Sequence, residues 1–540
     1  APAPSIAAPD PGVTETEPEA REFLKAVHYI SDSWPISFWE DFENSKVAGD
    51  LQQISADGFD TVILVIPWRG FDIGFNTDTP TAGKLDDRLV FLLEEIESAG
   101  LDFALRVSFP HSFDDEAGIG IWPLCRSVFT EPETRQEWVK YLGRISKIVD
   151  PYRSALKLVF FSWEDFFCPY SVMPKLQRDD RLELAKLTGF QDWLTSTQTL
   201  DLVEFLYSEQ FDSMLSVPVP HRNSPAFWLF IRFNDKFEYE QLVLPGRESF
   251  PELSMEVRVD KEGVMLSEGY SWVDLDLMTD DVVMRGSYWG PYQGAQNIGE
   301  VLDAAEALFN LENMLKRVSN DGMNRRHVLE QFNFIDNTPE FAGHHAYIDP
   351  SQLDQFLEGS APLLQEYSSG YGLWAYRDYA DSALYNGSFE LQKRGWESEG
   401  EVNVIRNADG DFAIKMQAGS RISQSFLPPD RFVALGSSTQ LHFCARIEPV
   451  SDPVNLALQF DDEVAGTLQM SQEGRHCTEL DINYALSGHI TFSVTSDSEI
   501  EVDDLQLYAF VQRLHVYDET GKPGPLLESI KKLNTEWITD

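Results

Sequence analysis

Residues 326–334 read RHVLEQFNF, a short and mostly apolar run of the kind expected for a buried parallel strand. Seven further runs of this kind alternate with amphipathic helical stretches, among them a long one expected over 297–318. The eight runs cover residues 26–30, 61–66, 101–109, 156–161, 253–259, 282–289, 326–334 and 371–376. This alternation predicts an α/β fold, a (β/α)8 TIM barrel. An open doubly wound sheet is the alternative, but no Gly-x-Gly-x-x-Gly follows the first strand.

The pattern of the chain changes on both sides of this region. Residues 1–20 are rich in Pro, Ala and Glu and predict a flexible leader before a barrel domain at 21–384. Residues 385–512 lack helical periodicity and alternate as strands do between turn signals, which predicts an all-β, jelly-roll-like sandwich. Residues 513–540 add one strand-like run and one short helix, and the sequence leaves open which domain this tail joins.

The charge of the chain restricts its partners. The sequence has 42 basic and 89 acidic residues among 540, a net charge of -47. Such a surface repels nucleic acid and anionic membranes, so neither is an expected partner. A polyanionic substrate is disfavoured unless Lys and Arg cluster locally in the cleft. Adaptation to salty water is an alternative explanation of the charge.

The expected location is secreted or periplasmic. The first residues, APAPSIAAPDPG, resemble what remains after removal of a signal peptide, or a trimmed chain. No apolar run reaches the roughly 18 residues that a membrane span requires. The cysteines fall two in each half, Cys125 with Cys168 and Cys444 with Cys477, which permits one disulfide per domain. No clustered Cys/His spacing suggests zinc, so we expect neither metal nor cofactor.

Two carboxylates mark the predicted active site. The site of a TIM barrel lies at the C-terminal ends of its strands. Glu330 lies inside the seventh run, and Glu164 directly follows the fourth, among aromatic residues. A charged carboxylate in such a setting is costly unless it is paired or used. A structural salt bridge explains either Glu alone, but strands four and seven lie nearly opposite each other, so we expect the two to face across the cavity.

A facing pair of carboxylates suits the cleavage of glycosidic bonds. One carboxyl group protonates the leaving oxygen while the other attacks the anomeric carbon or activates water. The aromatic surroundings of Glu164 favour its protonated form and the role of general acid. Glu330 is then the nucleophile, kept ionised by a cation such as Arg106. Asp165 is an alternative proton donor.

This arrangement resembles the clan A retaining glycoside hydrolases, which carry an acid/base Glu after strand four and a nucleophile Glu on strand seven. The stretch GFQDWL (189–194), followed by VP (217–218) and SPAFW (224–228), is similar to the segment after strand four in family 42 β-galactosidases. The resemblance implies that Tyr288 hydrogen-bonds the nucleophile, Trp374 floors the sugar subsite and Arg106 neutralises the nucleophile. Trp163 stands where most clan members have Asn, the residue that binds the sugar 2-hydroxyl.

The sequence therefore predicts a retaining hydrolase acting on β-linked oligo- or polysaccharides. Further expected sugar contacts are His28, Trp68, Trp163 and Trp289, all at predicted strand ends. The opening of the sandwich, NGSFE (386–390), resembles carbohydrate-binding modules attached to such enzymes. The alternatives are a non-catalytic polysaccharide-binding or matrix protein on the same barrel, and a hydrolase that trims polymer during exopolysaccharide export.

Overall fold

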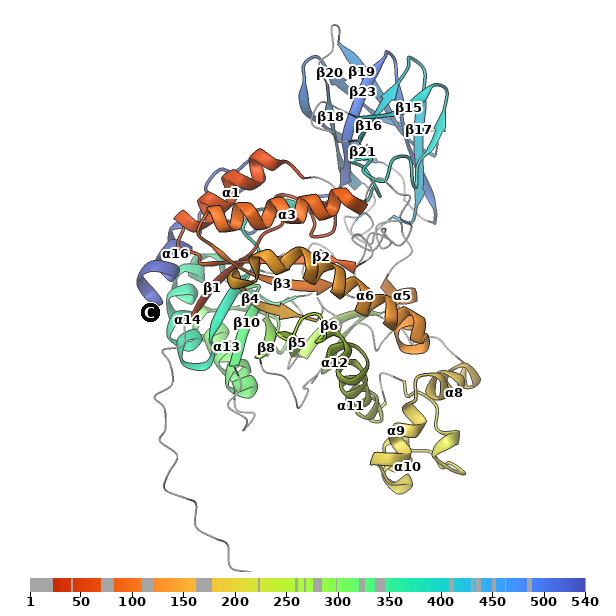
Figure 1. Cartoon of the computed structure of the whole chain (residues 1–540), viewed down its shortest axis with the longest axis vertical. Helices are drawn as coiled ribbons and strands as arrows, with labels where there is room; N and C mark the ends of the chain where they lie inside the picture. Colours follow the sequence, from red (N-terminus) through yellow and green to blue (C-terminus); the bar gives the residue numbers. More distant parts are fainter. Residues whose placement is uncertain are drawn as a thin grey trace, which may run out of the picture.

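The architecture is that of a closed barrel followed by a β-sandwich (Figure 1). The computed structural model describes residues 23–39, 42–68, 82–108, 121–161, 177–221, 224–257, 261–266, 269–274, 284–297, 299–319, 326–335, 345–406, 412–428, 432, 439–448, 453–461, 463–482 and 488–539. The barrel strands are β1 (Leu24–His28), β2 (Thr61–Pro67), β3 (Asp102–Ser108), β4 (Leu156–Phe160), β5 (Leu253–Val257), β8 (Met284–Trp289), β10 (Arg326–Phe332) and β12 (Gly370–Leu373). They are joined as parallel neighbours, and β12 pairs with β1 to close the ring. The predicted (β/α)8 barrel is confirmed.

Helices surround this ring. They include α1 (Asn44–Ala56), α3 (Ala82–Ser98), α5 (Ile121–Thr130), α6 (Pro132–Val149), α11 (Phe227–Glu238), α13 (Ala304–Ser319) and α14 (Leu353–Tyr367). Between β4 and β5 the chain also forms α8 (Arg178–Leu187), α9 (Phe190–Thr197) and α10 (Leu200–Tyr207), which lie apart from the ring in Figure 1. Within the described residues, no helix is long and apolar enough to cross a bilayer.

Strand alternation sorts the barrel side chains into two sets. A separate apolar cluster fills the interior, formed by Leu24, Ala26, Ile63, Ala104, Leu158, Phe160 and Val328. Successive side chains of a strand point to opposite faces, so every second residue after these also faces inward. The rule places His28, Arg106 and Glu330 inside the barrel, toward the C-terminal ends of their strands. The intervening residues, such as Val27, Leu105 and Leu329, belong to the large core outside.

Two local differences from the sequence prediction have clear causes. A helix was expected over 297–318, but α13 begins at Ala304. Asp303 and Glu306 form a reciprocal capping box there, with side-chain to backbone N–H distances of 2.8 and 3.1 Å. The residues before it form β9 (Val301–Leu302), paired with β11 (Tyr347–Ile348). A hairpin of β6 (Lys261–Leu266) and β7 (Gly269–Asp274), which the sequence did not predict, lies between β5 and β8.

The sandwich consists of two five-stranded antiparallel sheets around a core of their alternate residues. One sheet contains β14 (Glu397–Glu399), β17 (Arg421–Phe426), β22 (Ile490–Ser496), β19 (Val454–Phe460) and β20 (Glu463–Met470). The other contains β15 (Val402–Arg406), β16 (Phe412–Met416), β23 (Ile500–Tyr508), β18 (Thr439–Ile447) and β21 (Gly474–Ile482). Cys444 and Cys477 are register partners on β18 and β21 and form a disulfide. Cys168 lies outside the described residues.

The tail packs on the barrel, which answers the question left open by the sequence. β24 (Val511–Gln512) pairs with β13 (Tyr379–Ala380), just after the last barrel strand. The carboxylate of Asp57, which is completely buried, accepts hydrogen bonds from the hydroxyls of Tyr376 (2.8 Å) and Tyr517 (2.9 Å). Lys531 of α16 (Leu527–Lys532) contacts the same carboxylate at 3.2 Å. Asp57 therefore joins α1, the chain after β12 and the tail.

We expect Asp57→Ala to lower the free energy of unfolding by about 3 kcal/mol, because the change leaves a lysine and two buried hydroxyls without their shared acceptor. Asp87→Ala removes an exposed carboxylate from α3 and should change the free energy by less than about 0.5 kcal/mol. Urea titrations of both variants measure the difference. Equal effects would show that Asp57 does not hold the tail.

Candidate functional site

A buried arginine on β3 gathers polar side chains from three other barrel strands. The Nη2 atom of Arg106, on β3, lies 2.7 Å from Oε2 of Glu256 on β5 and 3.1 Å from Oε1 of Glu330 on β10. Its Nη1 atom donates to Oε1 of Gln331 at 2.8 Å and lies 3.3 Å from Nε2 of His28 on β1. All five residues are at least 95% buried. Because both carboxylates contact one nitrogen, they lie within a few ångströms of each other.

An irregularity in β10 brings two consecutive residues to the same arginine. The register of β10 against both neighbouring strands shifts between Val328 and Phe332. In a regular strand Glu330 and Gln331 would point to opposite faces. A β-bulge removes this alternation locally. Both side chains can therefore reach Arg106 from inside the barrel.

Two glycines make room for the carboxylate of Glu330 and its strand. A Cβ on Gly286, in β8, would lie 2.7 Å from Cγ of Glu330 and 2.8 Å from a ring carbon of Phe160. A Cβ on Gly372, in β12, would lie 2.3 Å from the carbonyl oxygen of Glu330. Real Cβ atoms do not approach other atoms so closely, so these positions require glycine. The space around Glu330 is thus built into both neighbouring strands.

His28 takes part as a neutral imidazole. Its Nδ1 atom lies 3.2 Å from the carbonyl oxygen of Leu373, which can only accept, so Nδ1 carries the proton. Nε2 is then an acceptor for Arg106. Burial, and next the charge of Arg106, hold the pKa of His28 well below its usual value. The ring also lies 4.8 Å from that of Trp374.

The remaining predicted site residues fall into three groups. Tyr288 shares the inner face of β8 with Gly286, and Trp374 follows β12 beside His28; both are buried. Trp68 and Trp289 lie away from the arginine cluster. The ring of Trp68 packs against Trp138 of α6 at 5.6 Å, and that of Trp289 stacks on Phe356 of α14 at 5.3 Å. Glu164 and Trp163 lie outside the described residues.

The sequence assigned no role to Glu256 or Gln331. Glu256 carries the same signal that drew attention to Glu330, because it is a carboxylate inside an otherwise apolar strand, LSMEVRV (253–259). Gln331 gives no such signal. Its position depends on the bulge in β10, which the sequence pattern does not reveal.

Comparisons with known proteins give only remote likenesses. No protein-family model and no curated protein matches the sequence. The exo-β-1,4-mannosidase Op5Man5 from Opitutaceae bacterium strain TAV5 is 12% identical, with a TM-score of 0.38 over 66% of this chain and 53% of that one. The chain thus spans about half the length of that mannosidase. A GH5_18 structure from Bifidobacterium longum subsp. longum is 13% identical, with a TM-score of 0.38 over 67% of this chain and 71% of that one.

A third likeness involves a shorter part of the chain. TmCBM61, solved with β-1,4-galactotriose, is 18% identical and has a TM-score of 0.19, covering 24% of this chain and 99% of that one. At such identities and TM-scores, none of these likenesses carries an argument about family or activity.

The lowered pKa of His28 predicts that acid destabilises the fold. The unfolded chain binds a proton at His28 near pH 6.5, whereas the native chain resists it, so the stabilisation is complete above that pH and is lost as the pH falls. The free energy of unfolding should fall by up to about 1.4 kcal/mol per pH unit below about pH 6.5 through this residue.

Urea titrations between about pH 7.5 and about pH 5 should show a smaller effect of pH on the free energy of unfolding in His28→Gln than in wild type. His489→Gln, at an exposed position of the sandwich, is the matched control and should follow wild type. If both variants followed wild type, His28 would not be the group that resists protonation.

Proposed function

We propose that the protein is a retaining glycoside hydrolase that cleaves β-glycosidic bonds in an oligo- or polysaccharide, with Glu330 as its nucleophile. The observation that carries the proposal is the contact of Glu330 with Arg106, 3.1 Å long, at the C-terminal side of the barrel interior. A cation at this distance favours the ionised carboxylate that a nucleophile must be. The active sites of TIM barrels lie at this end of the strands.

The proposed reaction has two steps. Glu330 attacks the anomeric carbon while Glu164, which follows β4 in the chain, gives its proton to the departing glycosidic oxygen. The glycosyl–enzyme ester is then hydrolysed by water, whose proton returns to Glu164. Glu330 loses its negative charge when the ester forms and regains it when the ester is hydrolysed. The positive charge of Arg106 stabilises the ionised carboxylate before and after the reaction.

The neighbours of Arg106 position it for this task. Gln331 and the neutral His28 accept hydrogen bonds from Nη1, and they fix the guanidinium plane without adding positive charge. Glu256 holds Nη2 from the side of β5. Because both carboxylates contact the same nitrogen of Arg106, the position of Glu256 affects the electric field at Glu330. Glu256 is therefore a positioning residue in this proposal.

Two aromatic residues complete the proposed site. Tyr288 would donate its hydroxyl to Glu330, and Trp374 would stack on the sugar bound at the cleavage point. Trp68 and Trp289 pack between the barrel and its helices, so the proposal does not include them. Glu330 itself has no exposed surface in this structure.

The proposed setting is outside the cytoplasm. The disulfide between Cys444 and Cys477 supports this, because such bonds persist in oxidising compartments. We propose that the sandwich acts there as a carbohydrate-binding module, as the NGSFE opening suggests.

Hydrolysis of a panel of aryl β-glycosides and β-linked polysaccharides tests the proposal. Glu164→Ala and Glu330→Ala should each lose at least about three orders of magnitude in kcat/KM. Azide should restore turnover to Glu330→Ala with a glycosyl azide of inverted anomeric configuration, since it occupies the place of the lost nucleophile. With Glu164→Ala, azide should instead give the product of retained configuration, because it then attacks the ester on Glu330.

Glu256→Gln is the matched control, because Glu256 contacts the same Arg106 nitrogen as Glu330. It should lower kcat without rescue by azide. Rescue of Glu256→Gln instead would move the nucleophile to β5. A wild-type protein that binds a polymer but cleaves no member of the panel would favour the non-catalytic polysaccharide-binding protein.

A further inference from the structure

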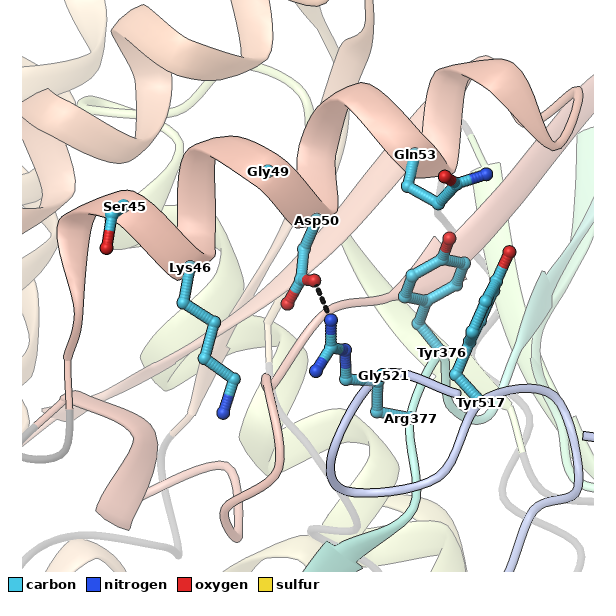
Figure 2. Close-up of a pocket in the computed structure, with 9 residues that line it drawn as sticks. All are labelled: Ser45, Lys46, Gly49, Asp50, Gln53, Tyr376, Arg377, Tyr517 and Gly521. Atoms are coloured by element: carbon cyan, nitrogen blue, oxygen red, sulfur yellow. Dashed lines mark hydrogen bonds and ion pairs between the residues drawn. The ribbon is translucent and has the colours of Figure 1, made fainter. Parts of the chain in front are cut away.

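A second pocket lies on the outside of the barrel, away from the Arg106 cluster. It has a volume of about 280 Å³ and is formed by α1, the chain after β12 and the tail loop around Gly521. Figure 2 shows the side chains of Lys46 and Asp50 descending from α1 toward Arg377, with the rings of Tyr376 and Tyr517 at the other end. The volume is suited to a ligand of about one sugar ring. No step of the proposed hydrolysis uses this pocket.

Among the described residues that line the pocket, Asp50 is the one carboxylate, and it is already hydrogen-bonded. Asp50 accepts a hydrogen bond from the hydroxyl of Tyr29 at 3.0 Å through Oδ2 and one from Arg377 through Oδ1. Its side chain is only 4% exposed. This carboxylate therefore has little capacity left to accept from a ligand.

Donors, by contrast, remain available. Lys46 has three N–H groups, and among the described residues its one ion pair is with Asp32 at 2.5 Å. Arg377 has five N–H groups, and its guanidinium gives one side-chain hydrogen bond within the described part of the chain, to Asp50. Figure 2 shows its second terminal nitrogen on the side of the pocket where Lys46 lies. Counted with the ion-pair partners of Lys46, the pocket has three positive charges (Lys46, Arg377 and Arg475, which contacts Asp32 at 3.6 Å) against two negative charges (Asp50 and Asp32), in a chain of net charge -47.

Gly49 keeps the wall of the pocket open. It lies in the interior of α1, where glycine is less stable than alanine because of its backbone freedom. A Cβ at this position would meet no atom within 4 Å, so packing does not require glycine. The missing side chain leaves space in the pocket, which is the simplest use of an otherwise unfavourable residue.

We propose that this pocket binds a carboxylate attached to a ring of sugar size, such as the uronic acid unit of an acidic saccharide. The single excess positive charge matches a monoanion, and Arg377 and Lys46 offer N–H donors to its two oxygens. Tyr376 and Tyr517, whose rings are almost wholly buried, close the far end of the space. This inference goes beyond the proposed hydrolysis, and it holds whether or not the barrel is catalytic.

Isothermal titration calorimetry on the whole protein tests the site with glucuronate, galacturonate, succinate and glucose as probes. We expect the uronates to bind with a Kd on the order of 1 mM and glucose at least about tenfold more weakly. Gly49→Met places a side chain in the empty space and should weaken uronate binding by at least about tenfold. Gln52→Met, at an exposed position of the same helix outside the pocket wall, should bind like wild type.

Lys46→Gln gives an independent measure, because it removes one charge and leaves the space unchanged. It should weaken the uronates and leave glucose unaffected. Succinate binding as tightly as the uronates would support a carboxylate site that does not select sugars. Absence of uronate binding, equal binding of glucose, or unchanged binding in Gly49→Met would each overturn the proposal.

Discussion

The interior of the barrel depends on how it holds the charge of Arg106. A guanidinium with no exposed surface is costly to remove from water, and the cost is offset only when its donors meet well-placed acceptors. Glu256, Glu330, Gln331 and His28 supply them from three further strands. His28, Glu256 and Glu330 can do so because inward-facing positions recur every second residue, and Gln331 can because the bulge in β10 interrupts that alternation. Arg106 and its four partners therefore fix the register of several strands, and the same contacts form the candidate site.

Most of the barrel could be predicted because its strands are buried on both faces. Such strands form short apolar runs, and the runs at 61–66, 156–161 and 326–334 overlap β2, β4 and β10 almost completely. The hairpin of β6 and β7 was not predicted, because the sequence pattern between the fifth and sixth runs resembles that of a loop. The attachment of the tail depends on the burial of Asp57 under two tyrosines that lie far along the chain. No local pattern contains such a contact.

The sequence could predict those site residues whose place depends only on lying at the C-terminal end of a barrel strand. His28, Arg106 and Glu330 were placed by this rule, and the structure brings them together. Trp68 and Trp289 were chosen by the same rule, but it does not tell which face of a strand a residue occupies. Ile63 faces inward, so Trp68, five residues later, lies on the outer face. Gln331 shows the opposite case, where a bulge cancels the alternation and brings a residue inside.

The large negative charge of the chain says little about either site. Exposed charges act over about 8–10 Å at ordinary ionic strength, and beyond that distance they are screened. At the pocket beside α1, the local balance of charge is set by Lys46, Arg377 and Asp50, with Asp32 paired to Lys46 and Arg475 paired to Asp32, and not by the total charge of the chain. Inside the barrel one arginine stands against two glutamates. The pocket beside α1 and the barrel interior have opposite local charge on the same acidic protein. An acidic sugar is therefore attracted to the pocket and repelled from the barrel interior. Under the two proposals together, a polymer with both uronic and neutral units would be held at the pocket beside α1 through its uronic units and cleaved inside the barrel at its neutral units.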